Sequence, residues 1–222
     1  MSVSPDVAAF DVDGTLTVRD CVRPFLEEVG GRAGLVAAVA RRPLGSLRAA
    51  AGRDRDLFKE IMVGGVLGGR PVEHVESLGE SFAERVAAAW LRADTLARLR
   101  WHQSRGDRTV LVSASLGQYL RPLGRRLGVD GVLCAEPRRE GGVFGRGLEG
   151  ANCRRAEKVR RLEEWLVAHG LERAVVWAYG DSSGDTELLS RADHPLWVRD
   201  VTVDPVPVGF GPSGSGPSGF ES

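Results

Sequence analysis

Two aspartates separated by a single residue follow an apolar stretch near the start of the chain. Residues 7–10 are apolar, and Asp11 and Asp13 come directly after them, followed by Gly14. Because ionised carboxylates are rarely buried without a partner, this pair predicts a bound cation. A hard cation such as Mg²⁺ takes oxygen ligands and brings bound water and substrate phosphate with it. Aspartate is also a nucleophile in aspartyl-phosphate chemistry, so one of these carboxylates is a candidate to attack phosphorus.

Calcium binding is the first alternative for this acidic pair. The pattern of Asp11, Asp13 and Gly14 is similar to the start of an EF-hand loop. An EF-hand also needs a third acidic position and a terminal glutamate, and both are missing here. The chemistry of phosphate and magnesium is therefore favoured.

Further residues that suit this chemistry occur where strands are expected to end. Ser113 terminates an apolar, β-branched run, and Asp181 and Asp185 follow another such run. Lys158 lies one turn into a predicted helix. The carboxyl ends of parallel strands share one edge of a sheet, so these side chains can converge on Asp11. Together they supply what phosphoryl transfer needs, namely a nucleophile, a metal bridge, groups for the phosphoryl oxygens and an acid for the leaving group.

Each of these residues also has an ordinary structural explanation. Serines such as Ser113 close many strands, and a lone lysine such as Lys158 is more often a surface residue. Asp181 suits a turn, and Asp185 suits the N-cap of the helix that begins at Thr186. The occurrence of all four motifs in this order, at strand ends, favours the chemical interpretation.

The order of elements that must position these residues predicts an α/β fold. Apolar and β-branched runs alternate with helical spacing, which is typical of a mostly parallel sheet. Strands are predicted at 7–10, 109–113, 131–135, 173–178 and 196–198, with helices at 116–127, 154–169 and 185–192.

The chain is expected to divide into a core, a helical insert and a tail. Residues 21–99 have helical spacing broken by Gly30-Gly31 and Gly64-Gly65, which predicts about four helices. Residues 1–20 and 100–204 then form the core, in which the glycine-rich segment 137–150 suits a hairpin or a mobile loop. The tail, 205–222, is rich in glycine, proline and serine and is expected to be disordered.

Composition narrows the class of function. The 222 residues carry 30 basic and 30 acidic side chains, so no charge excess favours a nucleic acid or an anionic membrane. No apolar run approaches the roughly 20 residues of a membrane span, and no signal peptide is evident. Cys21, Cys134 and Cys153 are odd in number and far apart, which argues against a disulfide framework and indicates the cytoplasm.

The chain resembles the haloacid dehalogenase-like (HAD) superfamily, and within it the phosphoserine-phosphatase-like subfamily with a helical cap after the first motif. The resemblance covers nearly everything up to about residue 204. The matching segments are 11–17, 112–115, Lys158 and 180–185. It implies a Rossmann-like parallel sheet, with the insert at 21–99 as the cap.

The resemblance also implies a role for each matching residue. Asp11 would be the nucleophile and Asp13 the general acid and base. The magnesium ligands would come from Asp11, Asp13 through its carbonyl, Asp181 and Asp185. The phosphoryl group would be held by Ser113, Lys158, Gly14, Thr15 and Ala114.

The presence of Asp13 favours hydrolysis of a phosphoester. Superfamily members such as dehalogenases and transport ATPases lack an acid two residues after the nucleophile, and they cannot easily protonate an alkoxide leaving group. The expected substrate is a small phosphorylated metabolite. Transfer to another hydroxyl by a phosphomutase or phosphotransferase remains an alternative, as does a non-catalytic protein that kept the fold.

The identity of the substrate stays open in the sequence, as does the oligomeric state. Phosphoserine phosphatase proper is one alternative, but those enzymes have a glycine pair after the second-motif serine, and Ala114-Ser115 stands there instead. Asp20 occupies the place of a substrate-binding glutamate in the cap region, and Arg53 or Arg55 is the candidate cationic partner. Asp20 suits the cap of the first insert helix equally well.

Overall fold

The computed structural model describes residues 5–207 and residue 209. Its main sheet has five parallel strands in the order β3-β2-β1-β6-β7. The strands are β1 (Val7–Phe10), β2 (Arg108–Leu116), β3 (Gly131–Ala135), β6 (Val176–Gly180) and β7 (His194–Trp197). The predicted α/β class with a parallel sheet is confirmed. The predicted tail, 205–222, falls almost entirely outside the described residues.

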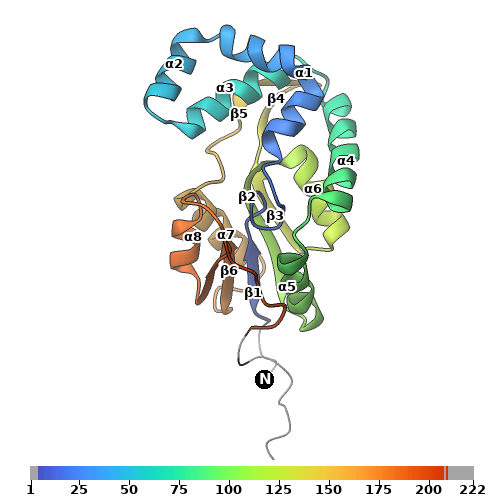
Figure 1. Cartoon of the computed structure of the whole chain (residues 1–222), viewed down its shortest axis with the longest axis vertical. Helices are drawn as coiled ribbons and strands as arrows, with labels where there is room; N and C mark the ends of the chain where they lie inside the picture. Colours follow the sequence, from blue (N-terminus) through green and yellow to red (C-terminus); the bar gives the residue numbers. More distant parts are fainter. Residues whose placement is uncertain (1–4, 208, 210–222) are drawn as a thin grey trace, which may run out of the picture.

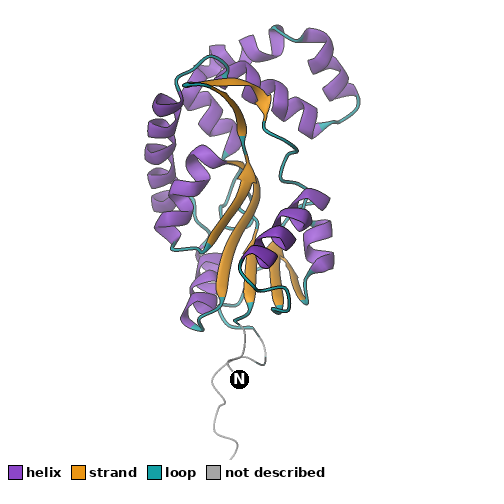
Figure 2. Ribbon diagram, turned by 180° about the vertical axis from the view of Figure 1, so that it is seen from behind, coloured by secondary structure: helices purple, strands orange, loops and turns teal. Residues whose placement is uncertain are grey.

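Helices cover both faces of this sheet (Figure 2). Successive side chains of β1 alternate between the faces. Val7 and Ala9 join one apolar cluster with α7 (Ala156–Ala168) and α8 (Thr186–Arg191). Ala8 and Phe10 join the other, which includes residues of α5 (Ala93–Ser104) and α6 (Gly117–Leu127). The central strand is therefore buried on both sides, as its uninterrupted apolar sequence requires.

Five helices separate β1 from β2, where about four were predicted. Besides α5, they are α1 (Val22–Ala40), α2 (Pro43–Ala51), α3 (Arg55–Leu67) and α4 (Val72–Ala89). α1 changes direction at Gly31, where φ is 66°. The predicted break at Gly64-Gly65 is wrong, because α3 continues through both residues.

Close packing explains why two adjacent glycines stand inside α3. A Cβ added to Gly65 would lie 2.5 Å from the Cβ of Ala38 in α1, and one added to Gly64 would lie 2.5 Å from the backbone nitrogen of Gly147. Both glycines let neighbouring residues approach the helix closely, so they are contact positions and not the helix break that the sequence indicates.

Helices α1, α2 and α3 lie beyond one end of the sheet, at the top of the view in Figure 1, whereas α4 packs against α6 and α5 against β2. The antiparallel hairpin of β4 (Pro137–Glu140) and β5 (Val143–Leu148) extends from the core to α3. Its Phe144 accepts a hydrogen bond from the backbone N–H of Gly69 at 2.7 Å. The hairpin alternative for this segment is confirmed. The residue boundaries of core and cap stay predictions.

No helix in the described part of the chain combines the length and the hydropathy that crossing a membrane requires.

Candidate active site

Asp11 stands at the point where β1 gives way to a tight turn. Its backbone N–H donates to the carbonyl of Tyr179 at 2.9 Å, which continues the pairing of β1 with β6 by one residue. The carbonyl of Val12 then accepts three backbone N–H groups of the turn that follows. Gly14 has φ +84°, and a side chain there would collide with the carboxylate of Asp181. The turn thus requires glycine and brings the loops after β1 and β6 together.

Lys158 is buried between two carboxylates. It lies in the first turn of α7, and its Nζ is 2.5 Å from Asp11 Oδ1 and 2.5 Å from Asp185 Oδ1. Burial lowers the pKa of Lys158, but the charges of Asp11 and Asp185 outweigh burial and hold this pKa above its ordinary value. The lysine is therefore a permanent cation beside Asp11.

Asp181 completes a group of three carboxylates that suits a divalent ion. One oxygen from each of Asp11, Asp181 and Asp185 lies within 4.8 Å of the others. Asp181 Oδ1 is buried and finds no hydrogen-bond partner among residues 5–207. A buried carboxylate oxygen without a partner is costly, and a hard cation would satisfy it. The donor set therefore fits Mg²⁺, with Asp185 also held by the N–H and hydroxyl of Ser182.

The carboxylate of Asp13 belongs to a different network. Its Oδ1 accepts the N–H of Cys21 at 2.9 Å, and its Oδ2 accepts the hydroxyl of Ser115 at 2.7 Å. Tyr119 in turn donates to Ser115 at 2.7 Å. These bonds fix the orientation of the Asp13 side chain.

Burial raises the pKa of both aspartates of the first motif. For Asp11 the pKa rises to about 7, because burial and the charge of Asp185 exceed the opposing effect of Lys158. For Asp13 the pKa rises to about 6, through burial and the charge of Asp20, against the hydrogen bonds from Ser115 and Cys21. A carboxyl group with a pKa near neutrality can donate a proton and take one back.

The remaining phosphate-binding candidates lie around the same edge. In the register of β1 and β2 the last pair is Phe10 with Leu111, so Ser113 lies two residues beyond it, at the end of the sheet where Asp11 follows β1. Ser113 is buried, and its Oγ accepts the N–H of Ser115 at 3.2 Å. Thr15 is also buried, and its hydroxyl has no hydrogen-bond partner within the described residues.

A lysine from the cap reaches this edge, although sequence reasoning did not find it. Lys59 of α3 donates to the carbonyl of Ala114 and, at 2.7 Å, to Asn152 Oδ1. Asn152 also donates to Asp56 of the same helix at 2.6 Å. Burial lowers the pKa of Lys59 to about 8, against the nearby charge of Asp13. The only indication of Lys59 in the sequence is its place among the apolar residues of α3. Residues in such a pattern usually pack the helix.

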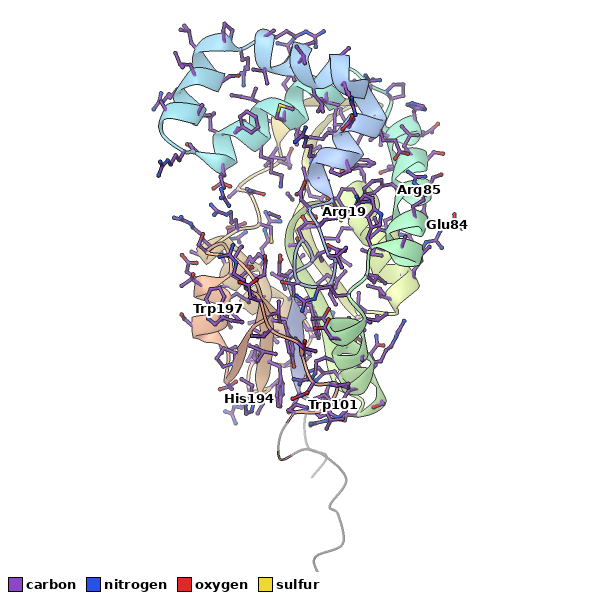
Figure 3. The ribbon with its side chains drawn as sticks, viewed as in Figure 1. Arg19, Glu84, Arg85, Trp101, His194 and Trp197 are labelled. Carbon is purple, nitrogen blue, oxygen red and sulfur yellow. The ribbon has the colours of Figure 1, made fainter. Side chains whose placement is uncertain are left out.

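The candidate substrate residues of the cap lie in different surroundings. Asp20 lines the cleft between cap and core, and its carboxylate accepts the N–H of Arg23 at 3.1 Å in the first turn of α1. Arg55 lines the same cleft, whereas Arg53 is not among the lining residues and adopts a φ of 50° before α3. Arg19, next to Asp20 in sequence, is labelled in Figure 3. Its guanidinium lies 3.6 Å from the ring centroid of Trp90, and this contact ties the loop before α1 to the end of α4.

The fold and this cluster agree with the family comparison. The family model of haloacid dehalogenase-like hydrolases matches residues 8–190, and the chain belongs to this family. The predicted membership is confirmed.

Individual relatives extend the comparison. Protein CicA of Caulobacter vibrioides is 37% identical over 209 residues, which cover 87% of this chain and 86% of that protein. A crystal structure of a Bordetella pertussis protein of unknown function has a TM-score of 0.66 at 25% identity and covers 85% of this chain and 87% of the other. A substrate-bound phosphoserine phosphatase has a TM-score of 0.59 at 19% identity, with 86% and 84% covered, which shows a shared fold.

Proposed function

We propose that the protein is a phosphatase that hydrolyses a phosphomonoester through an aspartyl-phosphate on Asp11. The observation that carries this proposal is the buried group in which Lys158 lies 2.5 Å from Asp11 while Asp181 keeps an oxygen unpaired within the described chain. Membership of a hydrolase family and the presence of an acid at Asp13 support it. We also propose a cytoplasmic location, which the three free cysteines support.

The first half of the reaction forms the covalent intermediate. A carboxylate oxygen of Asp11 attacks phosphorus, and the bond between phosphorus and the leaving oxygen breaks. Asp13 in its protonated form donates a proton to that oxygen, so the alcohol leaves neutral. Lys158, Ser113 and the backbone of the turn at Gly14 and Thr15 hold the phosphoryl oxygens as charge develops on them.

The second half regenerates the enzyme. Asp13, now a carboxylate, takes a proton from water, and the oxygen of that water attacks the phosphorus of the aspartyl-phosphate. The phosphorus–carboxylate bond breaks, which releases inorganic phosphate and restores Asp11. The hydrogen bonds from Cys21 and Ser115 keep Asp13 oriented for both proton transfers.

Asp11, Asp181 and the carbonyl of Asp13 would hold Mg²⁺, with Asp185 in support. A bound ion would offset the repulsion between the nucleophile and the negatively charged ester. The small phosphorylated substrate makes its other contacts in the cleft beneath the cap.

The test is phosphate release from p-nitrophenyl phosphate by the purified protein with Mg²⁺ and with a chelator. We expect turnover that depends on the metal and returns when Mg²⁺ is restored. A second assay offers an acceptor alcohol and analyses the products, because a phosphotransferase would give a new ester in place of inorganic phosphate. Absence of release, while calorimetry still detects Mg²⁺ binding, would contradict the proposal and favour a non-catalytic protein.

A further inference from the structure

A cavity of about 750 Å³ opens directly beside the proposed catalytic residues. Its inner end is formed by Asp13 and Ala114 of the core, and its walls come from α1 and α3 of the cap. Ligand sites of proteins commonly measure about 300–1,000 Å³, so this volume suits a ligand much larger than a phosphoryl group with two or three carbons. Since the cavity is continuous with the active site, its natural occupant is the alcohol part of the substrate.

Most of the exposed surface of this cavity is apolar, although the arginines Arg23, Arg55 and Arg154 also line it. α1 contributes Leu35, Val36 and Val39, and α3 contributes Phe58 and Met62. The side chains of Val36 and Phe58 remain 69% and 43% exposed, respectively, although they face the cavity side of their helices. Apolar surface gathered in a concave site is stabilised when an apolar ligand removes it from water.

Each acidic residue that lines the cavity accepts at least one hydrogen bond. Asp20 accepts the N–H of Arg23, and Asp56 accepts the side chain of Asn152. Asp13 accepts hydrogen bonds from Ser115 and Cys21. Binding the ammonium group of an amino acid requires an available carboxylate. Asp20 is exposed and accepts one N–H, so phosphoserine is the comparison substrate that tests whether this carboxylate binds an amino acid.

Lys59 marks the polar end of the cavity. Its ammonium group lies at the carbonyl of Ala114, where the apolar walls of α1 and α3 give way to the active site. A cation at one end and hydrocarbon along the walls match a ligand that is anionic at one end and apolar along the rest of its length.

From this arrangement we infer that the substrate is an amphipathic phosphomonoester, with a hydrocarbon chain on the alcohol that occupies the apolar cavity. The inference rests on the proposed phosphatase function and narrows its substrate class. It disfavours amino acid and sugar phosphates, whose hydroxyl, ammonium and carboxylate groups would lose water against Leu35, Val39 and Met62.

The experiment measures kcat/KM for ethyl, butyl, hexyl and octyl phosphate, and for phosphoserine and glycerol phosphate. Each methylene buried in the cavity should raise kcat/KM about threefold, so hexyl phosphate, with four more methylenes, should exceed ethyl phosphate by about 80-fold. A series that is flat, or a preference for phosphoserine, would overturn the inference while leaving the phosphatase intact. Failure to release phosphate from any ester would instead overturn the proposed function.

A double variant and a matched control test whether the cavity recognises the hydrocarbon chain of the substrate. The variant Val36→Ser/Phe58→Ser introduces hydroxyls into the walls at two exposed positions, and it should lower the octyl-to-ethyl ratio of kcat/KM by about tenfold. Leu47→Ser is the matched control, because Leu47 is 68% exposed on α2 and does not line the cavity. An unchanged ratio in the double variant would overturn the inference. Inhibition of the wild type by alkylphosphonates of rising length gives the same information without any substitution.

A final experiment distinguishes a substrate held in a lipid surface from one that is free in solution. Hexadecyl phosphate in mixed micelles with a non-ionic detergent presents the headgroup at a lipid surface, whereas octyl phosphate below its micelle concentration is a free ester. Faster turnover of the first assigns a lipid headgroup, and faster turnover of the second assigns a free amphiphile. Rates for both below that of ethyl phosphate would contradict the inference.

Discussion

The proposed active site differs from a second group of ionisable residues, at the start of α5, in how completely its charges are paired. We call Arg92, Asp94 and Arg98, with the backbone of 198–205 that they bind, the α5 anchor. In the anchor one carboxylate, Asp94, accepts hydrogen bonds from Arg92 and from two backbone N–H groups. Arg98 is buried and donates to the carbonyls of 204 and 205. At the active site one lysine, Lys158, is shared by two carboxylates.

The pKa values follow this difference. Burial raises the pKa of Asp94, but the hydrogen bonds from Arg92 and the backbone outweigh it and bring the value down to about 2. At Asp11 burial prevails, and the pKa rises to about 7. A fully paired carboxylate stabilises the fold in its charged form, whereas an under-paired carboxylate is costly until a cation and a phosphoryl group arrive. The structure thus completes the pairing of Asp94 in the anchor and leaves part of the negative charge at the active site without a partner.

The strongest test of this contrast removes the nucleophile. Asp11→Asn should lower turnover by at least about 10³-fold, because the amide cannot form the covalent intermediate. The variant should keep its secondary structure, since the amide retains the size of the carboxylate. Turnover is measured with p-nitrophenyl phosphate and folding by circular dichroism. Turnover in a folded variant above about one hundredth of the wild-type rate would rule out Asp11 as nucleophile.

The variant Asp181→Asn tests the role of Asp181 Oδ1, which has no hydrogen-bond partner within the described chain. We expect turnover to fall by about 10²-fold, because the metal loses a charged ligand. The free energy of unfolding, measured with urea in the presence of a chelator, should not decrease, since Asp181 Oδ1 has no hydrogen bond to lose within the described chain. A clear loss of stability with activity retained would reverse the comparison and make Asp181 a structural residue.

Removing the hydrogen bonds that orient Asp13 should have a smaller effect on turnover. The double variant Ser115→Ala/Tyr119→Phe removes the hydrogen bond to Asp13 Oδ2 without leaving a buried hydroxyl unpaired. We expect kcat to fall about tenfold, because Asp13 loses one of the two contacts that orient it for proton transfer. Tyr119→Phe alone keeps the Ser115 contact and serves as the control. If both variants have the same kcat as the wild type, the network has no part in catalysis.

Parallel topology explains how much of the site was predictable. Asp11, Lys158 and Asp185 are distant in sequence, yet the expected strand ends and the helix that carries Lys158 indicated that they could converge. The structure joins them through Lys158. The apolar runs that mark each strand are local properties of the sequence, and the carboxyl ends of parallel strands share one edge of the sheet. The α/β class was predictable for the same reason.

The cap was less predictable because long-range contacts position it. The cavity and the contact of Lys59 with Ala114 depend on where α3 lies over the core. That position is set by the close approach of Gly65 to Ala38 and of Gly64 to the hairpin. In sequence, two adjacent glycines indicate a break in a helix, and only the packed structure shows that they are contact points.

A substitution in the α5 anchor should have the smallest effect of the four. Its effect on the free energy of unfolding should depend on pH. The folded-state pKa of Asp94 is about 2, below the ordinary value of 3.8, so its contribution is fully present above pH 4–5 and is lost as the pH falls towards 2. We expect Asp94→Asn to lower the free energy of unfolding at pH 7 by about 1 kcal/mol, after allowance for screening by solvent at this partly exposed group. Urea unfolding at pH 7, 4 and 2.5 should show the difference between wild type and variant shrinking with acidity, while turnover at pH 7 stays within about twofold. A difference that grows towards low pH would mean that Asp94 is protonated in the fold, and the anchor would then resemble the active site instead of contrasting with it.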